Sequence, residues 1–391
     1  MTVPITFVTP RYGAEILGGA EAGARLLATR LAAEGRSVSV ITSCATSMQT
    51  WADDLPAGTT VEEGVRVTRC AVDQPRASDF DRLSDQVLPR ASEVSLAASE
   101  EWIAAQGPTS TSLIDAVAAV NDGVLVFYPY LYHPTVQGRR VARVPTILYP
   151  AAHREAPLAL AIFDEVFGSV DGLALQTRAE QALVEERFPA TRNRAQALVG
   201  LPVEMTTEAD ADAARAALGL GSEPFVLCLG RVDRGKGTHD LVERFAAFRE
   251  RRGGGRLVLA GPVAEAVPKT AGVECLGPIP DEHKFGLLAA AEVLVNPSFY
   301  EAFSIVMLEA WLAGTPVLVN GWCAPMVEHC EQSGGGLWYT GVSDFEMALG
   351  RLLDDPVARD ALGRAGERYV SDRYSWSAVR GRLDGLIRRV S

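Results

Sequence analysis

Two glutamates, Glu301 and Glu309, stand on either side of the predicted start of a helix. The apolar run Val293–Val295 ends at an Asn-Pro pair, as a buried parallel strand does, because proline cannot donate to a sheet. A second apolar run, Pro316–Asn320, predicts the next strand. Between the two strands, Ser304–Ala313 is apolar at nearly every position, which predicts a helix buried on all sides.

Glu309 lies in the middle of this apolar helix, where an ionised carboxylate requires a partner. No arginine or lysine lies one turn away on the same helix. Two interpretations follow. Either Glu309 and Glu301 bind the hydroxyl groups of a ligand, or Glu301 is a solvated loop residue and Glu309 pairs with a distant basic residue.

The backbone amides of Phe303, Ser304 and Ile305 fall at the helix start. These amides have no acceptor within a helix and lie at the positive end of its dipole, so they form an anion site. A diphosphate bound there would accept hydrogen bonds from these amides, and hydroxyl groups on either side of it would donate to the two glutamates.

A glycine-rich loop with two useful cations follows the predicted strand Phe225–Leu229. The sequence G-R-V-D-R-G-K-G occupies Gly230–Gly237, and a helix is expected to begin near Thr238. Arg231 suits bidentate phosphate binding and Lys236 adds a point charge. The order of residues is not that of a Walker A loop. The alternative is a turn that carries surface basic residues.

A second glycine pair, Gly18 and Gly19, lies between the predicted first strand, Ile5–Thr9, and the first helix. Because G-x-G-x-x-G is absent, the sequence argues against a nicotinamide cofactor.

His153 follows the predicted strand Thr146–Tyr149, at the strand end where ligands bind in parallel sheets. A capping or core role is the alternative. Three further histidines are expected on helix surfaces: His239, His283 and His329.

Composition narrows the class of protein. The chain has 391 residues, 48% of them hydrophobic and 22% charged, which is typical of globular domains. A net charge of -12 argues against a broad nucleic-acid footprint and against docking on anionic lipid. Six scattered cysteines without C-x-x-C are expected to be reduced and mostly buried. The start lacks the pattern of a secretory signal, no stretch is apolar enough to span a bilayer, and a cytoplasmic location is expected.

Strand-like and helix-like runs alternate in two series, which predicts an α/β architecture of doubly wound parallel sheets. The strands expected in the first series are Ile5–Thr9, Val38–Thr42, Val65–Cys70, Val124–Tyr128, Thr146–Tyr149 and Gly172–Gln176. Those expected in the second are Phe225–Leu229, Arg256–Ala260, Val273–Leu276, Val293–Val295 and Val317–Val319.

The polar passage from 203 to 223 separates the two series. We therefore expect an N-terminal domain over 1–203 and a C-terminal domain over 204–371. Residues 372–391 include a basic amphipathic helix that is expected to return to the N-terminal domain. Residues 79–106 lack strand runs and are expected to form a helical insertion.

Taken together, these motifs resemble those of the retaining nucleotide-sugar glycosyltransferases of family 4, also called glycosyl transferases group 1. The resemblance covers nearly the whole chain and is strongest where Gly230–Gly237 precedes the E-x7-E pair of Glu301 and Glu309. The N-terminal segment of the family's sequences is also similar to residues Pro10 to Glu21 of this chain, P-R-Y-G-A-E-I-L-G-G-A-E. The resemblance implies the GT-B fold, in which two Rossmann-like domains face each other across a cleft. The first domain would bind the acceptor and the second the nucleotide sugar.

The resemblance also assigns roles in the second domain. Glu309 would accept hydrogen bonds from the ribose hydroxyls, and Glu301 would face the donor sugar. The amides of 303–305 would hold the diphosphate. Arg231 and Lys236 would neutralise that leaving group in place of a metal ion.

Further roles are implied at the edges of this donor site. Backbone groups at Gly277 and Ile279 match the segment that contacts the base. Gly18 and Gly19 match the loop that closes on the donor, and His153 matches a histidine near the sugar.

The function expected is transfer of a hexosyl unit from a nucleoside diphosphate sugar, UDP- or GDP-linked, to a hydroxyl of a glycan or small molecule. The anomeric configuration would be retained, with no cofactor and no metal. Peripheral membrane contact is not favoured. Two alternatives remain: a sugar-nucleotide 2-epimerase, which releases product without an acceptor, and a non-catalytic sugar-nucleotide-binding protein.

The segment Gly321-Trp322-Cys323-Ala324-Pro325 departs from the glycine-rich turn that the family often has after its strand. Trp322 either stacks on a sugar or base, or fills the core. The sequence leaves both open.

Overall fold

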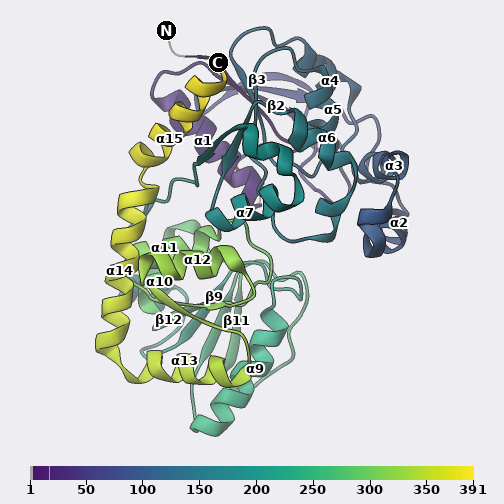
Figure 1. Cartoon of the computed structure of the whole chain (residues 1–391). Helices are drawn as coiled ribbons and strands as arrows, with labels where there is room; N and C mark the ends of the chain where they lie inside the picture. Colours follow the sequence, from purple (N-terminus) through teal and green to yellow (C-terminus); the bar gives the residue numbers. More distant parts are fainter. Residues whose placement is uncertain (1–2, 17) are drawn as a thin grey trace. The chain divides into compact units, whose positions relative to one another are not determined.

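A computed structural model describes residues 3–16 and 18–391. The chain forms two compact units, each an α/β structure around a mainly parallel sheet (Figure 1). Unit 1 comprises Met1–Leu201 together with Arg380–Ser391, and unit 2 comprises Pro202–Val379. The chain thus passes from unit 1 to unit 2 after Leu201 and returns to unit 1 at Arg380, within its last helix.

The sheet of unit 1 has the strand order β3-β4-β2-β1-β5-β6-β7-β8. Its strands are β1 Ile5–Val8, β2 Val38–Ser43, β3 Gly58–Glu62, β4 Val65–Cys70, β5 Val124–Phe127, β6 Thr146–Leu148, β7 Gly172–Leu175 and β8 Ala195–Leu198. Six of these match predicted strands, which are long apolar runs. The strands β3 and β8 were not predicted, because one is exposed and polar and the other is only half-buried.

The helices of unit 1 include the predicted insertion. They are α1 Gly19–Ala33, α2 Phe80–Val87, α3 Leu96–Gln106, α4 Thr111–Ala118, α5 His133–Val141, α6 Ile162–Ser169 and α7 Arg178–Arg187, with short 3-10 helices at Leu88–Glu93, Ala156–Ala159 and Pro189–Asn193. The C-terminal helix α15, Trp376–Val390, packs its buried residues Leu383, Leu386 and Ile387 within this unit.

The sheet of unit 2 is entirely parallel and has the order β11-β10-β9-β12-β13-β14. Its strands are β9 Val226–Leu229, β10 Leu257–Ala260, β11 Val273–Gly277, β12 Val293–Asn296, β13 Val317–Asn320 and β14 Gly336–Tyr339. Its helices are α8 Ala211–Ala217, α9 Thr238–Arg252, α10 Asp281–Ala290, α11 Ile305–Leu312, α12 Ala324–Ser333, α13 Val342–Asp354 and α14 Pro356–Tyr374. Helices α9 and α13 cover one face of the sheet, and α10, α11 and α12 cover the other (Figure 1).

The strand order of unit 2 reverses direction between β9 and β12. At such a point the loops that leave neighbouring strands diverge to opposite faces of the sheet, which opens a crevice at the carboxyl ends of the strands. The loop 230–237 leaves β9 and the loop 297–304 leaves β12 at this point.

Helix α11 is less buried than predicted. Met307, Leu308, Ala310 and Trp311 are buried, but the remaining side chains are partly exposed, Glu309 only slightly. The prediction that this helix is buried on all sides was therefore wrong, because one face of the helix is partly exposed despite its apolar composition.

None of the helices in the described residues combines the length and the apolar character that a bilayer crossing requires. All six cysteines are unpaired thiols, and every one except Cys275 is buried.

The prediction that His239 and His329 lie on helix surfaces was wrong, since both are buried. His329, on α12, is enclosed by Phe303, Tyr369 and Tyr374, and its Nδ1 lies 2.9 Å from the Tyr369 hydroxyl. Burial lowers the pKa of His329 to about 3, because the charged imidazolium is poorly solvated there.

This lowered pKa predicts acid sensitivity of unit 2. A histidine whose pKa is depressed on folding stabilises the fold above its unfolded pKa of about 6.5 and loses that contribution as the pH falls. Between about pH 7 and pH 5 the loss is expected to be about 2 kcal/mol. Denaturant unfolding of wild type and His329→Asn at both pH values measures it. The variant should show a smaller drop, and equal drops would contradict the assigned cause.

Candidate active site

The loops that follow β9 and β12 are joined by an ion pair between Lys236 and Glu301. The Nζ atom lies 2.7 Å from Oε1, with 36% and 17% of the two side chains exposed. Gly237 permits this approach, because its φ is 73° and a Cβ atom there would lie 2.6 Å from the Pro297 carbonyl oxygen. The structure therefore brings two of the predicted site residues together at the point where the strand order reverses.

Arg231, the other predicted cation, extends from the same loop with 53% of its side chain exposed. Its Nε donates to the carboxylate of buried Asp233. Asp233 also accepts a hydrogen bond from the Lys236 amide at 2.7 Å. Asp233 thus orders the loop that carries both cations. The sequence analysis missed this role because an aspartate inside a turn has many possible partners.

The start of α11 is held by the end of β12. Asn296 Nδ2 donates to Ser304 Oγ at 2.8 Å, and Ser304 has the left-handed φ of 61°, which is uncommon for a residue other than glycine. Within the described residues, no acceptor meets the amides of Ser304 and Ile305. These two amides therefore remain available as donors, and the anion site predicted at this helix start stays a prediction.

Glu309 has the distant basic partner that one of the two interpretations required. Lys284, on α10, places Nζ 2.6 Å from Glu309 Oε1, and only 13% of the glutamate side chain is exposed. Burial raises the pKa of Glu309, and the neighbouring lysine opposes that effect. The ion pair uses one carboxylate oxygen, Oε1, and within the described residues no hydrogen bond is formed by the other.

Gly277 and Ile279 lie where the edge strand β11 ends and α10 is about to begin. Gly277 has a φ of 72°, and its carbonyl oxygen accepts the Gly261 amide at 2.8 Å. Ile279 is half-buried. The segment leads directly into α10, the helix that carries Lys284. Because Lys284 contacts Glu309, the segment and Glu309 are both linked to the first turn of α10.

In unit 1, Gly18 caps α1 and Gly19 is its first residue. A Cβ atom at Gly18 would collide with the Glu21 carboxylate. Glu21 is buried and forms an ion pair with Arg11, which also donates to the Thr46 carbonyl oxygen at 2.8 Å. The glycine pair therefore adjoins a fixed, buried charge pair.

His153 lies beyond β6 with 27% of its side chain exposed. Its Nε2 is 3.7 Å from Glu155 Oε1, and Glu155 accepts a hydrogen bond of 2.8 Å from the Tyr130 hydroxyl. Burial raises the pKa of Glu155. The sequence analysis did not identify Glu155 or Tyr130, although the tyrosines that alternate through Y-P-Y-L-Y after β5 were a signal.

Residues 223–355 match the family model described as Glycosyl transferases group 1. A D-inositol 3-phosphate glycosyltransferase of Corynebacterium urealyticum is 30% identical over 262 residues, which cover 60% of this chain and 61% of that enzyme. The chain thus matches less than two thirds of that relative's length. An alpha-D-kanosaminyltransferase of Streptomyces kanamyceticus is 27% identical over 298 residues, 69% of this chain and 75% of that one.

Among solved structures, an Anabaena protein crystallised with UDP and glucose superimposes with a TM-score of 0.70 at 14% identity, over 99% of this chain and 100% of that one. This similarity concerns the fold. Residues 223–355 thus match the group 1 glycosyltransferase family, and the two units of the chain, each built on a mainly parallel sheet, have the GT-B fold.

Proposed function

We propose that this protein is a retaining glycosyltransferase that moves a hexosyl unit from a nucleoside diphosphate sugar to an acceptor hydroxyl. The observation that carries the proposal is the contact of Lys236 with Glu301 beside the open amides of Ser304 and Ile305. A cation and two unpaired donors at a strand-order reversal form a site for a diphosphate.

The donor is expected to lie along the carboxyl edge of unit 2. The diphosphate would bind at the α11 start, where Lys236 can donate to it and to Glu301 together, since an ammonium group has three donors. The ribose hydroxyls would bind the free oxygen of Glu309, and the base would lie near Gly277 and Ile279. UDP is supported by the Anabaena neighbour, which was crystallised with it.

Transfer is proposed to occur on one face of the sugar. The bond between the anomeric carbon and the phosphate oxygen breaks while the acceptor oxygen bonds to that carbon, and the departing phosphate oxygen takes the acceptor's proton. Arg231, Lys236 and the α11 amides would stabilise the charge that develops on the diphosphate, in the role that a metal ion plays in other transferases.

In unit 1, Gly18, Gly19 and His153 are proposed to contact the donor sugar or the acceptor. The unpaired thiols favour a reducing compartment, so we place the reaction in the cytoplasm. The 2-epimerase and the non-catalytic alternatives are not favoured, since both relatives named above are transferases.

Nucleotide binding can be tested by thermal unfolding with UDP, GDP and dTDP. A ligand at about 100 times its Kd adds about 2.7 kcal/mol, which raises Tm by several degrees. We expect one nucleotide to stabilise wild type and the control Glu282→Ala, an exposed position on α10, but not Glu309→Ala. Each shift is taken from the variant's own Tm, because Glu309→Ala also leaves Lys284 unpaired. Absence of any shift in wild type would contradict the proposal.

The role of Lys236 can be tested by turnover. Removing its charge in Lys236→Met is expected to lower kcat by about one to three orders of magnitude. Arg234→Met removes a charge from the same loop, but Arg234 is 74% exposed and faces Glu265, so its kcat should stay near that of wild type. Equal rates for the two variants would rule out a specific role for Lys236.

A further inference from the structure

Trp322, which the proposed function does not use, is not a core residue. It lies between β13 and α12 and is 69% exposed. Its Nε1 donates to the Thr340 carbonyl oxygen at 3.2 Å, and its amide donates to Asn320 Oδ1 at 3.1 Å. These bonds fix a large apolar ring at the surface, where one face of the ring is available to a ligand.

A hollow of about 40 Å³ lies beside this ring. Phe299 and Tyr339 add aromatic surface to it, and Asp240 and Arg244, from α9, add charge. A second hollow, of about 330 Å³, shares Asp240 and Arg244 with the first. The two hollows therefore adjoin each other at these two side chains.

Two charged side chains in these hollows, those of Arg244 and Asp240, belong to no ion pair within the described part of the chain. Arg244 lies over the Tyr339 ring, with Cζ 5.7 Å from the ring centroid, and its Nη1 is buried. Across residues 3–16 and 18–391, nothing forms a hydrogen bond with this Nη1, and neither Arg244 nor Asp240 belongs to an ion pair. Buried donors are nearly always paired with protein, water or a ligand, so this Nη1 can donate to an acceptor from outside the chain.

The chemistry of this surface favours a neutral sugar over a phosphate. Asp240 and Glu243 lie on the same helix as Arg244 and outweigh its positive charge, which disfavours an anion. A carboxylate and a guanidinium together accept from and donate to hydroxyl groups. The electron-rich face of Trp322 attracts the C–H groups on one side of a sugar ring.

We propose that Trp322, Phe299, Arg244 and Asp240 form an oligosaccharide-binding subsite on unit 2, which holds non-reacting sugar units of a neutral glycan. Phe299 belongs to the same loop as Glu301, so the subsite adjoins the donor site without sharing its residues. This inference does not depend on the identity of the donor.

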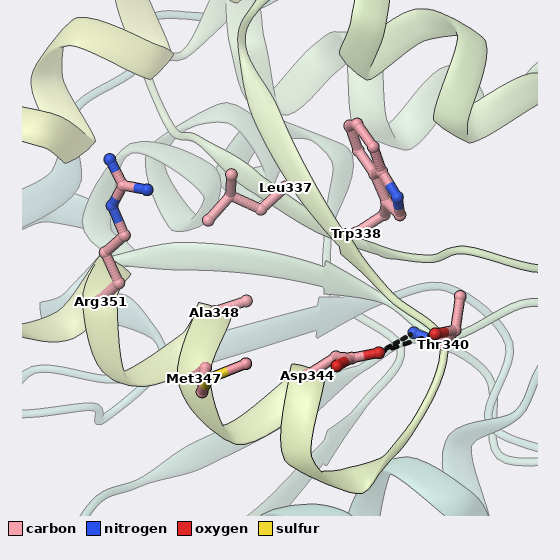
Figure 2. A pocket seen from close by; sticks show the side chains of 7 residues that line it. All are labelled: Leu337, Trp338, Thr340, Asp344, Met347, Ala348 and Arg351. Atoms are coloured by element: carbon pink, nitrogen blue, oxygen red, sulfur yellow. Dashed lines mark hydrogen bonds between the residues drawn. The ribbon is translucent and has the colours of Figure 1, made fainter.

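A neighbouring hollow provides the control position. It lies between β14 and α13 and is lined by Leu337, Trp338, Met347 and Arg351, among others (Figure 2). Its Thr340 and Asp344 already bond to each other at 2.7 Å, as the dashed lines in Figure 2 show. Arg351→Met removes a guanidinium from this hollow and leaves the proposed subsite unchanged.

The test is titration calorimetry of the full chain, without nucleotide, against neutral tetrasaccharides of glucose, mannose or galactose. At least one should bind wild type and Arg351→Met equally. Trp322→Ala and Arg244→Met should each weaken that binding by about tenfold or more, which corresponds to about 1.4 kcal/mol. Trp322→Tyr, which keeps a ring, should retain most of it.

Three results would overturn the subsite: no binding of any tetrasaccharide to wild type, unchanged binding by Trp322→Ala, or loss of the nucleotide-induced Tm shift in Trp322→Ala. The last result would place Trp322 in the donor site. If wild type shows no Tm shift with nucleotides but binds a tetrasaccharide through Trp322, the proposed transferase function fails and the subsite stands.

Discussion

The ion pair between Lys236 and Glu301 is the interaction on which the proposed donor site of unit 2 depends. It joins two loops that leave neighbouring strands at the reversal of the strand order, and its 2.7 Å length requires close approach of their backbones. Gly237 permits that approach, and Asp233 fixes the loop that carries the lysine. Because these groups are set before any ligand arrives, a diphosphate would meet donors that need little rearrangement.

The same unit pairs a second charge of the proposed site, the carboxylate of Glu309, without covering it completely. Glu309 is nearly buried, and Lys284 stabilises its ionised form while it occupies only one carboxylate oxygen. Removal of either partner would leave a poorly solvated charge, which is far more costly than the pair itself. Unit 1 uses the same device in the buried pair of Arg11 and Glu21 behind its glycine loop. An ion pair that is mostly buried keeps a charged group in a fixed position. Such a group can bind a polar ligand without a rearrangement of the hydrophobic core.

The sequence predicted the parts of the structure that depend on local pattern. Apolar runs located most strands, and the motif of Gly230–Gly237 identified the loop with Lys236. Contacts between residues far apart in the sequence were not predicted. Lys284 contacts Glu309 because α10 packs beside α11, and Glu155 contacts Tyr130 from a different loop. His329 shows a further limit, since nothing local distinguishes a histidine among buried aromatic rings from one on a helix surface. Polar strands such as β3 form because they pair with a buried neighbour, which periodicity does not reveal.

We propose that a nucleoside diphosphate binds at the loops that follow the paired strands β9 and β12. A crystal structure of the full chain with UDP, or with whichever nucleotide stabilises it most, tests this directly. We expect the diphosphate oxygens within hydrogen-bond distance of Lys236 Nζ and of the Ser304 and Ile305 amides, with a ribose hydroxyl on Glu309. A nucleotide bound elsewhere, with those amides still open, would contradict the account.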